Sequence, residues 1–377
     1  MALTLISVLS LFLTALYLAA VIFFRYGWKR NLSAPQDILA PKTLVSILIA
    51  ARNEEDKIAD TINDIISQDY PNELVELIVI DDHSTDRTAD IISGYSHRGV
   101  ILLKLNESEP LNSYKKKAIA EGIRLAKGEL LVTTDADCRM GNAWLKTIVA
   151  HYERYNYKLI SSPVVFFEEK SFFERLQTLE FLYLIGLGAA TIGNKRPSTC
   201  NGANLAYRKD VFVELKGFQG IDELASGDDE LFLHKVASKY PRDIGFCKSY
   251  EALVYTHAKP NLKEFIRQRK RWASKSTKYK DKKIVALGVS IWLFNLLIVI
   301  NAVLGFYYPG SWLVLVIVLI VKCLAEMYFL IPVTAFVKRK ELLFYLPLLT
   351  YVHAVYIIYI GVAGNTGKYI WKGRLVK

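Results

Sequence analysis

The chain has 377 residues, is 52% hydrophobic and carries a formal net charge of +11. This hydrophobic share is high for a soluble protein and low for a protein made only of membrane helices, so a soluble domain of about 250 residues with several membrane spans fits best. Segment 267–283 alone contributes a charge of +8, from nine basic residues and one acid. The basic residues are not spread over a soluble domain and no nucleic-acid-binding motif accompanies them, which excludes nucleic acid as a partner.

The first predicted element is a membrane helix at residues 4–24, which are almost wholly apolar. A helix of this length covers about 31 Å, enough to cross a bilayer. Arg25, Lys29 and Arg30 follow it, and basic flanks mark the cytoplasmic side of a span. Residues 1–30 are therefore predicted to be an uncleaved anchor, followed by a cytoplasmic domain at 40–283.

Strands and helices alternate in the next part of the chain. The predicted strands and helices, in order, are 44–50, 55–68, 77–80, 100–105, 113–127 and 129–134, of which 55–68 and 113–127 are helical. This alternation indicates an α/β domain with a mostly parallel sheet. Ligands of such sheets bind at the carboxyl ends of the strands, where acidic residues of this chain are found.

Asp135 and Asp137 directly follow the last of these strands. Two carboxylates at a strand end can hold one hard divalent cation, Mg²⁺ or Mn²⁺, that also takes oxygens from a pyrophosphate. Such a pair is often only a solvated turn. Its place at a strand end of an α/β domain favours the metal site.

Asp81 and Asp82 close the second strand, and Glu54 follows the first. Asp81 or Asp82 can accept hydrogen bonds from a nucleobase or ribose, and Glu54 is predicted to face the same nucleotide. The alternative for the second strand end is a plain turn in which Asp86 caps the next helix.

Lys115 is the first of three consecutive lysines at a helix start, where a cation opposes the helix dipole unless a phosphate is near. A solvated charge run is the alternative for its neighbours Lys116 and Lys117. Further along, Asp228 and Asp229 precede a helical run, where they are either ordinary caps or candidates for a general base that deprotonates a hydroxyl.

Gln268, Arg271 and Trp272 are spaced i, i+3 and i+4, so they share one face of a helix. A guanidinium binds a phosphate with its fork of donors, and a flat ring stacks on a sugar. These three side chains suit a site that holds a nucleoside diphosphate beside a sugar acceptor. The basic segment around them is also typical of the cytoplasmic membrane surface and of contact with anionic lipids.

The last region, 284–377, is predicted to hold two to three spans, at 284–307, 311–337 and 342–363. If all three cross, the basic C-terminal tail lies outside, against the charge rule. Either the last segment is re-entrant or interfacial, or the number of predicted membrane spans is wrong by one. Segment 171–193 has an apolar part of only 13 residues and is predicted to lie in the interface or the core.

Four motifs occur in a fixed order: Asp81/Asp82, Asp135-x-Asp137, Asp229 and Gln268-x-x-Arg271-Trp272. This order resembles the membrane-integrated inverting glycosyltransferases of family 2, a group that includes cellulose, chitin and hyaluronan synthases and ceramide glucosyltransferases. The resemblance covers roughly residues 44–283. It implies a GT-A-type, Rossmann-like nucleotide-sugar domain with flanking transmembrane helices in a bacterial inner membrane.

The resemblance also implies a role for each motif. On the donor side, Asp81 or Asp82 contacts the nucleobase, Lys115 lies near the diphosphate, and Asp137 binds the metal with help from Asp135. The remaining roles concern the acceptor and the leaving group: Asp229 is the base, with Asp228 in place of the usual glutamate, Arg271 grips the pyrophosphate, and Trp272 and Gln268 border the acceptor.

The expected function is metal-dependent, inverting transfer from a UDP-sugar to a lipid, lipid-linked or growing glycan acceptor at the cytoplasmic membrane face. A processive polysaccharide synthase is the alternative that the Gln-x-x-Arg-Trp motif favours, whereas the few spans favour a lipid or short glycan. A non-catalytic scaffold that binds nucleotide sugars is an alternative of another class. A transporter would need more spans.

Overall fold

The computed structural model describes residues 1–35, 41–106, 113–364, 369–371 and 374–376. The chain divides into two compact units, which are described separately. The helical unit comprises residues 1–29, 168–186 and 258–367, and the sheet unit comprises residues 30–167, 187–257 and 368–377. The predicted domain borders at 30, 40 and 283 stay predictions.

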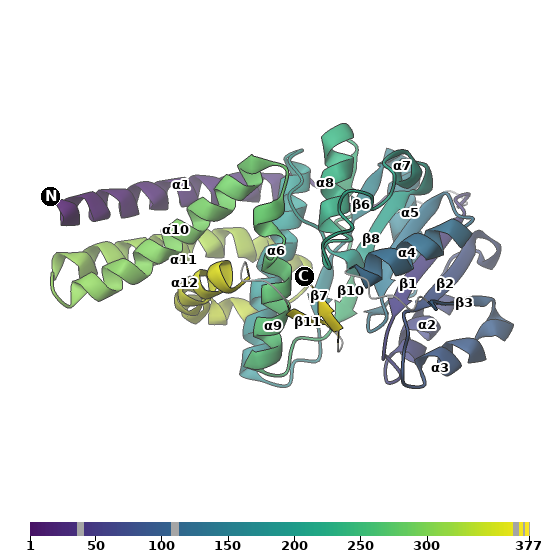
Figure 1. The fold of residues 1–377 in the computed structure, drawn as a ribbon. Helices are drawn as coiled ribbons and strands as arrows, with labels where there is room; N and C mark the ends of the chain where they lie inside the picture. Colours follow the sequence, from purple (N-terminus) through teal and green to yellow (C-terminus); the bar gives the residue numbers. More distant parts are fainter. Residues whose placement is uncertain (36–40, 107–112, 365–368, 372–373, 377) are drawn as a thin grey trace. The chain divides into compact units, whose positions relative to one another are not determined.

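The sheet unit is built on a seven-stranded sheet with the order β3-β2-β1-β4-β8-β6-β9 (Figure 1). Its strands are β1 (Val45–Ala51), β2 (Val75–Asp81), β3 (Val100–Lys104), β4 (Leu130–Asp135), β6 (Leu159–Ser161), β8 (Leu205–Arg208) and β9 (Ile244–Phe246). The first four strands pair in parallel, and β8 runs antiparallel to β4 and to β6. The predicted α/β class and all four predicted strands are confirmed.

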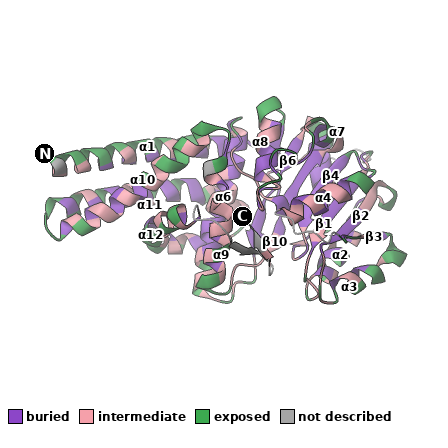
Figure 2. Ribbon diagram, in the orientation of Figure 1, coloured by how far each residue is buried: buried purple, intermediate pink, exposed green. Residues whose placement is uncertain are grey.

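The core strands are buried on both faces, as Figure 2 shows by the purple colour of the sheet. Ile47, Ile49 and Ile78 have no exposed surface, as expected for parallel strands that helices cover. The register pairs Ala51 with Asp81 and brings the end of β4 beside the end of β1. The acidic residues that follow β2 and β4 therefore lie at the same edge of the sheet.

Six helices accompany this sheet: α2 (Ile58–Ile66), α3 (Thr88–Gly94), α4 (Tyr114–Leu125), α5 (Trp144–Tyr155), α7 (Lys209–Glu214) and α8 (Glu230–Lys239). Helix α4 packs on β1 and β2, and a Cβ atom at Gly122 would lie only 2.8 Å from the Ile80 side chain. A glycine at this position lets the helix approach the sheet closely. The predicted helices at 55–68 and 113–127 are confirmed with shorter ends.

Two small sheets complete the unit. One has the order β5-β10-β7, formed by Arg139–Met140, Val254–Thr256 and Val164–Phe166. The other is an antiparallel pair near the C-terminus, β11 (Tyr369–Trp371) with β12 (Arg374–Val376). This last pair belongs to the sheet unit although it follows the membrane helices in sequence.

The long helices are α1 (Ala2–Arg30), α6 (Phe172–Gly193), α10 (Lys282–Gly305), α11 (Gly310–Phe336) and α12 (Leu346–Ala363), with the shorter α9 (Leu262–Ala273). By length and composition, α1, α6, α10, α11 and the stretch Lys340–Ala363 are able to cross a membrane. Helix α6 is one continuous helix of 22 residues. The 13-residue apolar part of segment 171–193 was predicted to be too short to span a membrane. In the structure the polar residues before it continue into the same helix, which makes the helix long enough.

A buried ion pair lies inside the helical unit. Lys322 Nζ donates to Glu326 Oε1 at 2.7 Å, and the Lys322 side chain has no exposed surface. Glu326 also accepts hydrogen bonds from Tyr17 of α1 at 2.8 Å and from Thr350 of α12 at 2.9 Å. The carboxylate is therefore satisfied by three helices, as a charge in an apolar bundle requires.

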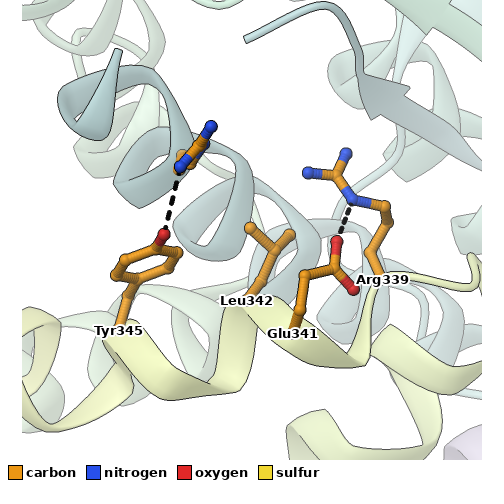
Figure 3. Close-up of a pocket in the computed structure, with 5 residues that line it drawn as sticks. Arg339, Glu341, Leu342 and Tyr345 are labelled. Carbon is orange, nitrogen blue, oxygen red and sulfur yellow. Dashed lines mark hydrogen bonds and ion pairs between the residues drawn. The ribbon is translucent and has the colours of Figure 1, made fainter.

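The helical unit also contains a pocket of about 280 Å³ (Figure 3). It is lined by Arg175, Arg339, Glu341, Leu342 and Tyr345. Arg339 donates to Glu341 at 2.5 Å, and Arg175 donates to the Tyr345 hydroxyl at 3.4 Å. The residues of the four sequence motifs do not line this pocket.

Candidate active site

A cluster of opposite charges lies at the carboxyl end of β4. Lys115 Nζ donates to Asp135 Oδ1 at 2.6 Å and lies 3.4 Å from Asp228 Oδ2. Lys115 comes from the first turn of α4, and Asp228 precedes α8. The structure therefore brings together three residues that the sequence placed in one site.

Burial alone would lower the pKa of Lys115, but the carboxylates of Asp135 and Asp228 outweigh it and raise the pKa above its usual value. Lys115 is thus a permanent cation, and these carboxylates compensate its unfavourable place at a helix start. The solvated-run alternative is wrong for Lys116, which is buried and donates to the backbone oxygens of Leu224 and Ser226.

Asp135 and Asp137 offer two carboxylate ligands next to each other. One oxygen of each carboxylate and the sulfur of Cys138 lie within 4.8 Å of one another. Burial, and then the two carboxylates, raise the pKa of the Cys138 thiol, which leaves it protonated and unsuited to a hard cation. Each of these carboxylates lies near a lysine. Lys115 pairs with Asp135, and Lys57 Nζ lies 3.9 Å from Asp137 Oδ2. Two partly exposed oxygen ligands that already attract cations fit Mg²⁺ or Mn²⁺.

Asp229 is the N-cap of α8. Its Oδ1 accepts from the Glu230 N–H at 2.6 Å, and its Oδ2 accepts from the Gly202 N–H at 2.9 Å. A Cβ atom at residue 202 would lie 3.2 Å from the Asp229 Cβ, so glycine permits this approach. Asp229 therefore caps α8, as one of the two alternatives predicted, and its hydrogen bonds from Glu230 and Gly202 fix the orientation of its carboxylate. The role of Asp229 as a base stays a prediction.

Asp82 is buried at the end of β2 and binds a residue that the sequence analysis missed. Arg374 Nη1 lies 2.9 and 2.8 Å from the two carboxylate oxygens of Asp82, and the Arg374 guanidinium stacks 3.6 Å from the Tyr114 ring centre. Arg52 donates to the backbone oxygens of Asp82 and His83 at 2.8 and 2.7 Å. The one sequence signal for Arg374 was the conflict between the basic tail and the charge rule.

The other two predicted nucleotide-side residues lie near this edge with mainly local contacts. Asp81 Oδ1 accepts from the Ser84 N–H at 3.3 Å, which forms the expected turn. The Glu54 N–H donates to Thr88 Oγ1 at 2.8 Å. Asp86 accepts from the Thr88 N–H at 3.0 Å, but the N-cap of α3 is Arg87, so the predicted cap is displaced by one residue. Contact of Asp81 or Glu54 with a nucleotide stays a prediction.

Gln268, Arg271 and Trp272 all lie on α9, so the predicted helix is confirmed. All three side chains are partly exposed. The Trp272 ring lies 6.0 Å from the Phe181 ring of α6. Helix α9 belongs to the helical unit, and the participation of its three motif residues in the site stays a prediction.

The glycosyl transferase family 2 sequence model matches residues 46–216, which run from the second residue of β1 to beyond β8 and include the Asp135–Asp137 motif. The chain is 26% identical over 256 residues to "Probable glycosyltransferase YdaM" of Bacillus subtilis, covering 65% of this chain and 58% of that protein. It is 32% identical over 133 residues to "UDP-Glc:alpha-D-GlcNAc-diphosphoundecaprenol beta-1,3-glucosyltransferase WfaP" of Escherichia coli, covering 34% of this chain and 46% of that protein. The chain thus spans about half the length of these curated relatives.

Among solved structures, the fold is similar to mannosyltransferase PcManGT from Pyrobaculum calidifontis, which was determined in complex with GDP-Man and Mn²⁺. The TM-score is 0.60 at 18% sequence identity, and the match covers 93% of this chain and 99% of that chain. This likeness confirms the GT-A-type architecture that the sequence predicted. The family match shows that residues 46–216 of the chain carry a glycosyltransferase family 2 domain.

Proposed function

We propose that this protein transfers a sugar from a nucleotide sugar, a UDP-sugar, to a lipid, lipid-linked or growing glycan acceptor, with inversion of the anomeric configuration. The observation that carries the proposal is the cluster of Lys115, Asp135 and Asp228 beside Asp137, at the strand end where sheets of this type bind ligands. A solvated turn would not hold a buried cation between two carboxylates from different parts of the chain.

The donor diphosphate needs positive charge along its length. Lys115 supplies a permanent cation from the sheet unit, and Arg271 is proposed to grip the pyrophosphate with its forked donors. The nucleobase or ribose is assigned to Asp82 or Asp81, with Glu54 in the same layer. The choice of a UDP-sugar follows the family resemblance and the donor in the name of the Escherichia coli relative.

Asp137 and Asp135 would hold Mg²⁺ or Mn²⁺, which is the chemistry that their paired oxygens suit. When bound, such a cation supplies neutralisation of the charge that grows on the leaving diphosphate. The Mn²⁺ in the complex of the Pyrobaculum calidifontis protein, which shares this fold, supports the same choice. Lys115 would then turn from Asp135 toward the diphosphate oxygens.

The acceptor hydroxyl needs a base on the opposite side of the sugar from the leaving group. We assign this role to Asp229, whose orientation is fixed by the N–H groups of Gly202 and Glu230. Asp228 is the second candidate because it directly precedes Asp229, at the position of the usual glutamate of the family. The proton passes to the carboxylate, the oxygen bonds to the anomeric carbon, and the bond to the diphosphate breaks with inversion.

The acceptor is proposed to be membrane-bound and to contact Gln268 and Trp272. Five apolar helices support a membrane protein, and Arg25, Lys29 and Arg30 after the first span support a cytoplasmic catalytic domain in a bacterial inner membrane. The acceptor in the name of the Escherichia coli relative is a sugar on diphosphoundecaprenol, which supports a lipid-linked acceptor here. A processive synthase is the other form of the same chemistry.

The test is a donor screen with the purified full-length protein in lipid nanodiscs. UDP-, GDP- and dTDP-sugars are supplied with lipid acceptors, and release of the nucleoside diphosphate is scored with Mn²⁺, with Mg²⁺ and with EDTA. We expect metal-dependent release from a UDP-sugar, and product length then separates single transfer from polymer synthesis. Binding of UDP without turnover of any donor would instead indicate a scaffold, and preference for a GDP-sugar would reject the UDP assignment.

A further inference from the structure

We propose that Arg269 is a positioning residue, which fixes the side chains of Gln268 and Trp272 through a buried ion pair with Glu180. The inference rests on the proposed function, in which Gln268 and Trp272 border the acceptor. Arg269 is not one of the motif residues, and its side chain points to the interior of the helical unit while Gln268 and Trp272 are partly exposed.

The ion pair is deeply buried and joins three helices. Arg269 of α9 is 3% exposed and Glu180 of α6 is 7% exposed. Arg269 Nε lies 3.1 and 3.2 Å from the two Glu180 oxygens, and its Nη2 also donates to Glu180. The Tyr356 hydroxyl of α12 donates to the same carboxylate at 3.3 Å. Since loss of either partner leaves a charge buried without compensation, this pair holds α9 in one position against α6 and α12.

The same guanidinium determines how Gln268 is presented. Arg269 Nη1 lies 2.6 Å from Gln268 Oε1. A guanidinium carries donors only, so it must face the oxygen of the amide and not the NH₂ group. The NH₂ group is then what Gln268 can offer to a substrate, where it donates to a hydroxyl or ring oxygen of the acceptor. Without Arg269, the Gln268 amide is free to rotate by half a turn and to present its oxygen, which only accepts hydrogen bonds, to the substrate.

Arg269 also contacts the tryptophan of the motif. Its guanidinium carbon lies 4.3 Å from the centre of the Trp272 ring and 4.6 Å from the centre of the Phe265 ring. A planar cation on an aromatic face is attracted by the ring quadrupole, and arginine stacks in this way whereas lysine is a point charge. One residue therefore orients both Gln268 and Trp272, which a purely structural ion pair has no reason to do.

The helical unit offers a matched control for this claim. Lys322 and Glu326 form a second buried ion pair, whose described partners are Tyr17 and Thr350 and not residues of α9. Glu180→Gln and Glu326→Gln each remove one buried carboxylate from the same unit. Both variants are expected to lower the melting temperature, so stability alone does not separate them, and the separation has to come from the acceptor site.

The experiment uses the full-length protein labelled with 5-fluorotryptophan in nanodiscs, with the Trp272 resonance assigned from Trp272→Phe. Arg269→Lys and Glu180→Gln are expected to shift or broaden the ¹⁹F resonance of Trp272 and to lower kcat/KM for the acceptor by about 10- to 100-fold. The affinity for UDP is expected to fall by a smaller factor than kcat/KM for the acceptor, because Lys115 and the proposed metal ligands are unchanged, whereas Arg271 lies on the same helix as Arg269. Glu326→Gln is expected to leave both the Trp272 resonance and the acceptor KM as in the parent.

The inference is overturned if Arg269→Lys retains the parent's Trp272 resonance and acceptor KM, or if Glu326→Gln changes them as much as Glu180→Gln does. If Arg269→Lys does not fold, Glu180→Asp, which keeps the charge on a shorter side chain, is judged by the same criteria. A parent protein that transfers no sugar rejects the proposed function. The ¹⁹F resonance still decides whether Arg269 positions Trp272.

Discussion

Arg374 binds both carboxylate oxygens of Asp82, at 2.9 and 2.8 Å, although the two residues are 292 positions apart. Asp82 directly follows β2, at the edge of the sheet where the nucleotide is proposed to bind, and its side chain is 3% exposed. The antiparallel pair β11–β12 carries Arg374 to this position. Arg374 therefore lies at the same edge of the sheet unit as Asp82.

Replacing Arg374 should weaken donor binding. In Arg374→Ala the buried Asp82 loses the cation that balances it, so it repels the donor diphosphate and is no longer held in place. We expect the Kd for UDP, measured by calorimetry, to rise about tenfold, which corresponds to about 1.4 kcal/mol. Arg124→Ala, which removes an exposed arginine of α4, is the control and should bind UDP like the parent. Equal affinities in the two variants would separate Arg374 from the donor site.

The same contact makes a prediction about membrane topology. Strand β4 before α6 pairs with β8 after it, so α6 does not cross the bilayer. Asp82 and Arg374 must also be on one side of the bilayer, so an even number of the helices α10, α11 and α12 cross it. A tight turn joins α10 to α11, so these two helices form a hairpin that can cross as a pair. We therefore expect α10 and α11 to cross and α12 to be re-entrant or interfacial, which is one of the two explanations that the sequence left open.

This topology can be read by labelling with an impermeant maleimide, after the four native cysteines are replaced. Tyr307→Cys in the α10–α11 turn should react in intact cells, whereas Leu375→Cys in β12 should react only after lysis. Reaction of Leu375→Cys in intact cells would show that α12 crosses the membrane and would be incompatible with the Arg374–Asp82 contact.

Local sequence patterns made much of this site predictable, whereas contacts between residues far apart in the sequence could not be predicted. Strand ends and short motifs identified Asp82, Asp135 and Asp137, because alternation of strands and helices fixes where such residues lie in a parallel sheet. The contacts Arg374–Asp82 and Arg269–Glu180 join positions 292 and 89 residues apart. No periodic pattern marks these partners, since each is a single residue whose meaning depends on tertiary packing.

The metal assignment predicts a specific loss in Asp137→Ala. With one of two carboxylate ligands gone, Mn²⁺ should no longer improve UDP binding, and we expect the gain in affinity on adding Mn²⁺ to fall at least tenfold. Asp69→Ala is the matched control, because Asp69 is an exposed aspartate paired with Lys146 on the same unit. Calorimetric titration of UDP with Mn²⁺ and with EDTA measures both. A parent-like response to Mn²⁺ in Asp137→Ala would reject this ligand.

His151 predicts how stability depends on pH. His151 is 1% exposed and its ring packs against Tyr155 and Tyr157, and burial lowers its pKa from 6.5 to about 4. The unfolded chain then binds a proton between these pH values that the folded chain does not. The contribution of His151 to the free energy of unfolding is therefore fully present above pH 6.5. It falls as the pH drops toward 4, by on the order of 3 kcal/mol.

The check is denaturant unfolding of the parent and of His151→Phe at pH 7 and pH 4.5. The phenylalanine keeps a flat apolar ring in the site and cannot take up a proton. We expect the loss of unfolding free energy between the two pH values to be smaller in His151→Phe than in the parent. An equal loss would mean that His151 does not contribute to the acid sensitivity.

Single-turnover transfer of a labelled sugar tests most directly whether Asp229 is the base. Asp229→Asn keeps the shape of the side chain and one acceptor oxygen, so UDP-sugar should bind as in the parent while transfer falls by about 10²- to 10⁴-fold. Asp228→Asn should weaken donor binding through Lys115 and slow transfer less. Parent-like transfer in Asp229→Asn, or a complete loss in Asp228→Asn alone, would contradict the assignment of Asp229.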